Sequence, residues 1–134
     1  MYVKNRMTKN PICIDVNAKI SDVVDIMSEK NLHRIPVVSG KKLVGLVTEG
    51  MISKKGASKA TSLSIYELNY LLSKTSVDAI MIRDVITIHE DRFLEDAALL
   101  MFKHDIGCLP VVNDDNEVVG ILTSNDVLSS FLDC

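Results

Sequence analysis

The hydrophobic and polar positions of this chain follow a plan that occurs twice. Short apolar runs at residues 12–14 and 85–88 predict strands, because β-branched residues favour extended backbone. After each run, apolar residues recur at spacings of three and four, which predicts a helix with one buried stripe. The two stripes are Ile20, Val23, Val24 and Met27, and Leu94, Ala97, Ala98 and Met101.

A hairpin is predicted after each of these helices. The apolar runs 35–38 and 109–112 carry a proline near their start, where a missing backbone N–H is tolerated best. The polar turns 39–42 and 113–116 follow, and each leads into a third apolar strand. The third strand runs directly into another helix, so we expect the order β-α-β-β-α in each half of the chain.

The two halves also match residue by residue. Residues 3–38 superpose on residues 77–112, and after one inserted residue near Asp115 the match continues with Gly45 on Gly120 and Thr48 on Thr123. We therefore expect an α+β fold of two repeats with pseudo-twofold symmetry. The expected boundaries are residues 1–53 for the first repeat, 54–76 for a connector and 77–134 for the second repeat.

The connector carries a helix signal of its own. Ser64 and Glu67 have the spacing of a capping box, in which the serine caps the helix and the glutamate answers from the third helical position. Leu68, Leu71 and Leu72 then supply an apolar face. This helix can pack on the repeats or form part of a dimer surface. Residues 54–60 before it are polar and basic, which favours a solvated loop.

The clearest candidate chemistry lies at the end of the last strand. Thr123, Ser124 and Asn125 are good N-cap residues, and the first N–H groups of a helix can hold an anion such as phosphate. Asp126 would repel a phosphate, but its oxygens can accept hydrogen bonds from both hydroxyls of a ribose. Sugar with phosphate suggests a nucleotide. The alternative, that these residues simply cap a helix, remains open.

The first repeat has the same segment with a defect. Residues 42–52 keep the glycine and the threonine, but Met51 stands at the position of Asp126. Only the second repeat therefore retains an acidic residue at this place. Upstream, the first repeat has His33 and Arg34 where the second has Gly107 and Cys108.

Composition narrows the classes of function. The 134 residues are 47% hydrophobic and 25% charged, which is typical of a globular domain. An aromatic content of 4%, no tryptophan and a net charge of −3 argue against a nucleic-acid binder. No apolar run approaches the roughly 20 residues that span a bilayer, and no signal-peptide pattern occurs at the start of the sequence.

The candidate reactive groups show no catalytic pattern. The three cysteines are widely spaced and suit reduced thiols, so we expect a cytoplasmic protein. The histidines lie too far apart in sequence for a local metal motif. The glycines Gly40 and Gly45 lack the Lys-Ser/Thr pair of a phosphate loop, and no Gly-x-Ser-x-Gly elbow occurs. We expect no metal, no catalytic cofactor and no enzymatic activity.

The two repeats resemble a tandem pair of cystathionine-β-synthase (CBS) domains. The resemblance rests on the runs 35–38 and 109–112 and on the segment 120–126, Gly-Ile-Leu-Thr-Ser-Asn-Asp, and it covers nearly the whole chain. Residues 60–74 resemble the acetoin-utilisation branch of CBS-pair proteins. Members of that branch often carry a further ACT domain. We expect none here, with the chain being either a natural short form or a truncated one.

The resemblance implies a function. It implies a regulatory homodimer, a flat disc, that binds AMP, ADP, ATP, S-adenosylmethionine or cyclic di-AMP in clefts between the repeats and signals to a protein partner. The alternative is a ligand-independent dimerisation scaffold with vestigial clefts. The resemblance also implies ligand-binding residues: Val85, Ile86, Thr87, Pro110, Thr123, Ser124, Asn125, Asp126, His33, Arg34, Ile12 and Thr48.

The implied roles differ between the repeats. Thr123 would lie near phosphate or ribose, Asp126 on the ribose hydroxyls, and residues 85–87 around the adenine. In the first repeat His33 and Arg34 would meet a phosphate, for which the forked donors of arginine are suited. The basic pair of one repeat and the acid of the other would then complement each other in a single shared site.

Overall fold

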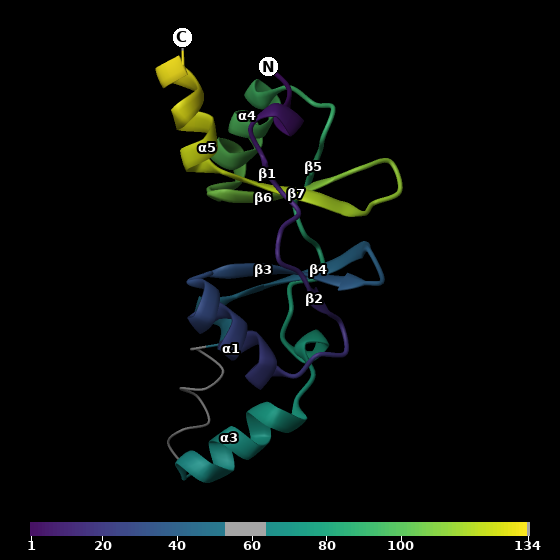
Figure 1. Cartoon of the computed structure of the whole chain (residues 1–134), viewed down its shortest axis with the longest axis vertical. Coiled ribbons are helices and arrows are strands. Elements are labelled where there is room, and N and C mark those ends of the chain that lie inside the picture. The colour runs from purple at the N-terminus through teal and green to yellow at the C-terminus, as the bar shows by residue number, and fades with distance from the viewer. Residues whose placement is uncertain (53–63, 134) are drawn as a thin grey trace. The chain divides into compact units, whose positions relative to one another are not determined.

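The computed structural model describes residues 1–52 and 64–133, and its elements follow the repeated plan (Figure 1). The first repeat contains β2 (Ile14–Asp15), α1 (Ile20–Lys30), β3 (Arg34–Ser39) and β4 (Lys42–Thr48), after which a helix begins at Glu49. The second repeat contains β5 (Ile88–His89), α4 (Leu94–His104), β6 (Cys108–Val112), β7 (Val118–Thr123) and α5 (Ser124–Ser129). The predicted α+β order β-α-β-β-α is confirmed in both repeats.

The compact units of the fold exchange their leading segments. Unit 1 consists of Met1–Pro11, Lys41–Leu43 and Ile86–Cys134, and unit 2 consists of Ile12–Gly40 and Val44–Val85. The first residues of the chain thus belong to the unit built from the second repeat. Correspondingly, residues 77–85 belong to the unit built from the first repeat.

Unit 1 is built on a four-stranded sheet in the order β1-β7-β6-β5, in which β1 is Thr8–Lys9. β5 runs parallel to β6, and β6 and β7 form the predicted antiparallel hairpin. β1 pairs antiparallel with β7, so that Thr8 faces Ile121. Nothing in the hydrophobic pattern predicted β1, because two exposed residues carry no period.

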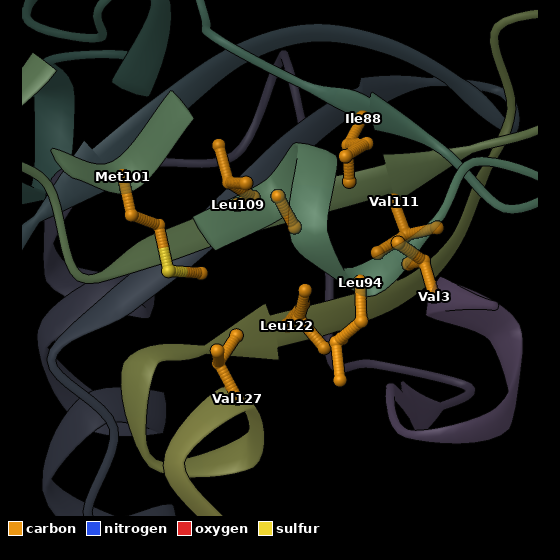
Figure 2. Packing of buried hydrophobic residues seen from close by; sticks show 9 residues of the cluster. Val3, Ile88, Leu94, Met101, Leu109, Val111, Leu122 and Val127 are labelled. Carbon is orange, nitrogen blue, oxygen red and sulfur yellow. The ribbon is translucent and has the colours of Figure 1, made fainter. Parts of the chain in front are cut away.

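The core of unit 1 lies between this sheet and its helices (Figure 2). The buried residues of the α4 stripe contribute Leu94, Ala97 and Met101, as predicted. Val3, from the 3₁₀ helix Val3–Asn5, is fully buried in the same cluster. The N-terminal segment therefore contributes core side chains as well as a strand. The other members are Ile88, Leu109, Val111, Leu122 and Val127.

Unit 2 repeats this plan with a three-stranded sheet in the order β2-β3-β4. Ile14 of β2 pairs in parallel with Val37 of β3. The core gathers buried residues from the strands and α1, together with Val77 of the 3₁₀ helix Val77–Ala79. Val77 is equivalent to Val3 of unit 1, so each core takes one valine from the segment that precedes the other repeat's first strand.

The connector helix α3 (Ile65–Lys74) is confirmed and contacts α1 of unit 2. The Ser64 hydroxyl accepts a hydrogen bond of 3.2 Å from the backbone N–H of Glu67, which makes Ser64 the predicted N-cap. Tyr66 and Tyr70 are exposed on this helix. The part of the connector that we interpret as a solvated loop lies outside the described residues.

The first strand of each repeat is shorter than predicted. Only Ile14 and Ile88 of the runs 12–14 and 85–88 lie in strands, and the residues before them extend past the paired region. Within the part of the chain that the structure describes, β5 pairs with β6 alone, through Ile88–Val111 and His89–Val112. Residues 12–13 and 85–86 are therefore apolar because they are partly buried. The hydrophobic pattern of the sequence does not distinguish such burial from strand pairing.

Two equivalent glycines allow these leading segments to approach the sheets. A Cβ atom on Gly120 would overlap the side chain of Met7 and lie 3.0 Å from the backbone oxygen of Thr8. A Cβ atom on Gly45 would overlap the side chain of Met81 and lie 2.9 Å from the backbone oxygen of Ile82. Close approach of another backbone explains why both repeats have glycine at this position.

Candidate ligand-binding site

The start of α5 in unit 1 is held by a reciprocal pair of hydrogen bonds. The backbone N–H of Thr123 donates to Oδ2 of Asp126 over 2.8 Å, and the Thr123 hydroxyl accepts from the backbone N–H of Asp126 over 3.3 Å. This arrangement is a capping box, so the capping interpretation of the sequence is correct for one carboxylate oxygen. Oδ1 of Asp126 makes no hydrogen bond to any residue that the structure describes, and it remains available to a ligand.

The strand before β7 lies beside this helix start. The backbone N–H of Ser124 donates to the carbonyl oxygen of Gly107 over 2.9 Å, and Thr123 pairs with Cys108 in the β6–β7 ladder. The side chains of Ser124 and Asn125 are exposed. Unit 1 therefore brings the predicted residues 123–126 together at one end of the hairpin, next to Gly107.

Three other predicted residues of unit 1 come from β6 and from the segment just before β5. Pro110 is fully buried in β6, and Ile86 packs against the core of the unit. Thr87 lines a separate hollow of about 360 Å³, and neither Thr123 nor Asp126 lines it. Its other lining residues are Ile88, His89, Arg92, Asp96, Leu99 and Leu100.

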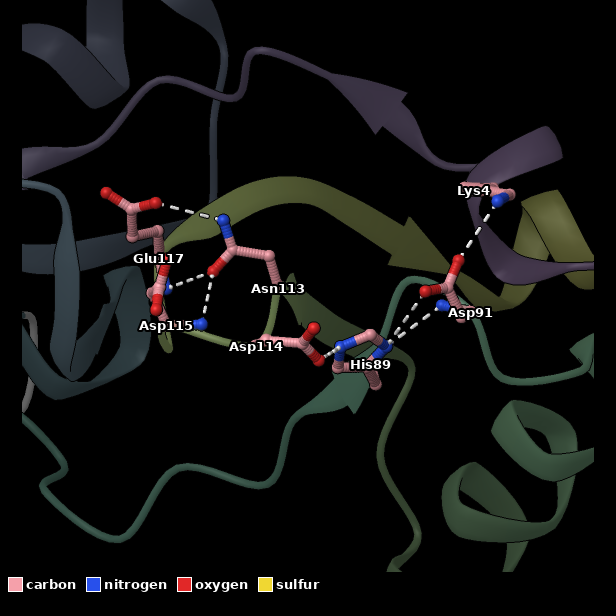
Figure 3. Close-up of polar contacts among 7 residues, drawn as sticks. All are labelled: Lys4, His89, Asp91, Asn113, Asp114, Asp115 and Glu117. Atoms are coloured by element: carbon pink, nitrogen blue, oxygen red, sulfur yellow. Dashed lines mark hydrogen bonds and ion pairs between the residues drawn. The ribbon is translucent and has the colours of Figure 1, made fainter.

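His89 of that hollow is held by two aspartates (Figure 3). Its Nδ1 accepts a hydrogen bond of 3.1 Å from the backbone N–H of Asp91, so Nε2 carries the proton and donates to Asp114 over 2.7 Å. Lys4 pairs with Asp91 at 2.9 Å, and this hydrogen bond lowers the pKa of Asp91 and raises that of Lys4. The network ties the N-terminal segment and the β6–β7 turn to β5, which is a structural role.

The β6–β7 turn is itself rigidly hydrogen-bonded (Figure 3). Oδ1 of Asn113 accepts from the backbone N–H groups of Asp115 and Glu117, each over 3.0 Å. Its Nδ2 donates to the Glu117 carboxylate over 2.9 Å. The hydrogen bonds of Asn113 therefore fix the conformation of this acidic turn. Among the described residues, no group of three or more His, Cys, Asp and Glu side chains could hold a metal ion.

The helix start of unit 2 keeps half of the capping box. The Thr48 hydroxyl accepts from the backbone N–H of Met51 over 3.3 Å, as Thr123 does in unit 1. The reciprocal bond is missing because Met51 has no carboxylate. The other candidates of unit 2 lie on its surface or near it: Ile12 is 40% exposed, Val85 is half-buried and Arg34 is exposed at the start of β3.

A residue that sequence reasoning missed faces His33 in unit 2. Nδ1 of His33 lies 2.5 Å from Oε2 of Glu49, and the backbone N–H of Glu49 donates to the His33 carbonyl over 2.8 Å. Both side chains are mostly exposed. They line the rim of a hollow of about 370 Å³, whose other residues are Val24, Met27, Ser28, Asn31, Leu32 and Ile52. In the alignment of the two repeats Glu49 matches Ser124, and this difference in charge could have drawn attention to Glu49.

Two further observations concern a cysteine and the lengths of the helices. The cysteine Cys13 is half-buried, and desolvation by burial raises the pKa of its thiol, so it is a poor nucleophile. No helix of the described ranges combines the length and apolar character that crossing a bilayer requires.

Comparison with known proteins assigns both repeats to one kind of module. The family model of the CBS domain matches residues 3–57 and 77–133. L-aspartate semialdehyde sulfurtransferase from Methanocaldococcus jannaschii is 35% identical over 130 residues, which are 96% of this chain and 23% of that protein. Homoserine O-acetyltransferase from Methanocorpusculum labreanum is 38% identical over 125 residues, which are 92% of this chain and again 23% of the relative. The chain thus spans about a quarter of the length of these relatives.

Solved structures match nearly the whole length of the chain. The CBS domain pair of protein MJ0100, in complex with 5′-methylthioadenosine and S-adenosyl-L-methionine, is 34% identical, with a TM-score of 0.79 over 98% of this chain and 99% of that one. A protein from Vibrio cholerae described as an acetoin utilization protein (AcuB) is 28% identical, with a TM-score of 0.80 over 99% and 91%. The predicted resemblance to tandem CBS pairs is confirmed.

Proposed function

The chain belongs to the CBS-domain family, and we propose that it is a regulatory module, not an enzyme, which binds an adenosine-containing ligand and signals to a protein partner in the cytoplasm. The MJ0100 pair, which matches nearly the whole chain, was solved with two adenosine-containing ligands. The observation that carries the proposal is the half-buried carboxylate of Asp126, whose Oδ2 lies in the helix cap and whose Oδ1 has no hydrogen-bond partner within residues 1–52 and 64–133.

We assign the ribose to Asp126. Because Oδ2 is already fixed by the Thr123 N–H, the carboxylate is pre-oriented, and Oδ1 has lone pairs for a ribose hydroxyl. The exposed side chains of Ser124 and Asn125 can donate hydrogen bonds to a phosphate or to the sugar. Val85, Ile86 and Thr87 are assigned to the adenine by family resemblance. In the first repeat Ile12 takes the position that matches Ile86, and Thr48 takes the position that matches Thr123, near phosphate or ribose.

One observation favours the alternative of a ligand-independent scaffold. The capping box already gives Asp126 a structural role, because it satisfies two backbone groups of α5 without any ligand. An enzymatic role is disfavoured on different grounds. The activities named for the curated relatives belong to proteins about four times as long as the part that this chain matches.

Titration calorimetry with a panel of AMP, ADP, ATP, S-adenosylmethionine, 5′-methylthioadenosine and cyclic di-AMP tests the proposal. The decisive variant is Asp126→Asn, because asparagine keeps an oxygen for the Thr123 N–H but loses the charge. We expect its affinity for the best ligand to fall about 10- to 100-fold, the effect of removing a hydrogen bond to a charged group.

The matched control is Asp22→Asn. Asp22 caps α1 of unit 2 in the same way, accepting from the backbone N–H of Lys19 over 3.1 Å. We expect this variant to lose as little stability as Asp126→Asn and to bind the ligand like wild type. If no member of the panel binds, the scaffold is the better description. If a ligand binds and Asp126→Asn binds it as well as wild type, the assignment of the ribose to Asp126 is wrong.

We also propose that the chain forms a homodimer through unit 1. Its helices α4 and α5 pack together, and they expose large apolar side chains along with the 3₁₀ helix Ser130–Asp133. Exposed apolar patches of this kind mark association surfaces. The exposed residues are Leu99, Phe102, Leu128, Phe131 and Leu132, of which Phe102 is 88% exposed.

Light scattering of the purified chain measures this directly. We expect a dimer for wild type and a monomer for Phe102→Asp, because the new carboxylate would have to be desolvated in the interface. The neighbouring exposed Lys103, changed to glutamine, alters the net charge by the same amount and should leave the dimer intact. A monomeric wild type would contradict the proposal.

A further inference from the structure

The two units place different side chains on the same backbone frame. In unit 2 the backbone N–H of Glu49 donates to the carbonyl oxygen of His33 over 2.8 Å. In unit 1 the equivalent bond runs from Ser124 to Gly107 over 2.9 Å. On this shared frame, unit 1 presents a hydroxyl and no opposing side chain, whereas unit 2 presents a carboxylate and an imidazole in contact.

The contact engages one ring nitrogen of His33. Nδ1 lies 2.5 Å from the Glu49 carboxylate, so only Nε2 is left to meet a ligand. A phosphate that approaches His33 therefore meets a carboxylate that already holds the imidazole and repels the incoming charge.

The ion pair between His33 and Glu49 is weak, so a ligand phosphate can compete with Glu49 for the imidazole. The side chains of His33 and Glu49 are 67% and 57% exposed, and ion pairs at such positions contribute little to stability. The carboxylate is thus not required for the fold. The Glu49 carboxylate therefore acts mainly on a ligand group that approaches His33.

We propose that Glu49 is a specificity-determining residue of unit 2, which disfavours phosphate-bearing ligands by occupying His33 and by its own charge. The inference deepens the proposed function and rests on it for the adenosine part of the ligand. Unit 2 then prefers an adenosine compound whose 5′ substituent carries no phosphate. Unit 1 has Ser124 at this position and does not discriminate in this way.

The first test follows the His33 ring by NMR during titration with inorganic pyrophosphate at low ionic strength. Relative to wild type, we expect Glu49→Gln to lower the pyrophosphate concentration at half-maximal shift about three- to tenfold, because the anion no longer competes with a carboxylate. The matched control is Glu29→Gln, an exposed glutamate of α1 that removes the same charge elsewhere in unit 2. Identical curves for wild type and Glu49→Gln, or an equal effect of Glu29→Gln, would overturn the proposal.

The second test compares two adenosine ligands by calorimetry. Glu49→Gln should raise the affinity for ATP by a similar factor and leave that for 5′-methylthioadenosine unchanged. In the background of His33→Asn, the effect of Glu49→Gln on ATP should shrink, since part of it acts through the imidazole. An equal change for both ligands would contradict the role in phosphate selection. If neither ligand binds any variant but the pyrophosphate curves differ, the proposed adenosine function fails while the role of Glu49 stands.

Discussion

The helix starts at Thr48 and Thr123 have the same cap and different charged groups around it. Both threonine hydroxyls accept a backbone N–H three residues later, over 3.3 Å in each unit. Unit 1 adds the carboxylate of Asp126, whereas unit 2 has Met51 there and places a carboxylate at Glu49, against His33. The cap is kept because the backbone requires it, while the positions that face outward are free to specialise for different ligands.

The strands β4 and β7, which lead into these helix starts, both keep a glycine because they are tightly packed there. Gly45 and Gly120 each lie under a methionine of the segment that precedes the other repeat's first strand, Met81 and Met7 respectively. No ligand chemistry can act at such a position, because the space above the glycine is filled by backbone and side chain. The comparison therefore predicts equal effects where the repeats are packed and unequal effects where they are exposed.

The largest expected effect on stability comes from the shared glycines. Gly45→Ala and Gly120→Ala should each lower the free energy of unfolding by about 1–3 kcal/mol, because the new methyl group overlaps a methionine side chain and crowds a backbone oxygen. Urea unfolding measures both. Gly50→Ala is the control, since a Cβ atom there meets nothing within 4 Å and alanine favours a helix. A large loss at only one of the two glycines would break the equivalence of the units.

A smaller effect is expected from copying the acid of unit 1 into unit 2. Met51→Asp supplies the missing acceptor for the backbone N–H of Thr48, and we expect it to raise the free energy of unfolding by about 0.5–1 kcal/mol. It also gives unit 2 a candidate ribose acceptor. Calorimetry of the variant should therefore show additional or tighter binding of the adenosine ligand.

The volume-matched control for that variant is Met51→Leu, which keeps an apolar side chain of similar size and adds no acceptor. It should resemble wild type in stability and binding. If Met51→Asp gains stability without any change in binding, the acid acts only as a cap in this unit. That result would also weaken the assignment of the ribose to Asp126.

Much of the fold follows from local pattern. The apolar stripes of α1 and α4, the two hairpins and the cap at Ser64 are predicted and found, except that Val24 of the predicted α1 stripe is exposed. The strand boundaries are predicted less well, because Ile12 and Val85 are apolar without being paired. At the candidate site, the pattern predicted the cap and the acid at Asp126 together, and the structure describes how one carboxylate oxygen serves the cap.

The sequence by itself determined which residues are helical, which are extended and that the plan occurs twice, because these depend on neighbours within a few positions. The tertiary structure decided the contacts between residues far apart in the chain. It brought Val3 into the core of unit 1, paired Lys4 with Asp91, 87 positions away, and set Glu49 against His33 across 16 positions. Periodicity carries no record of such pairs, since they form only when strands and helices have packed.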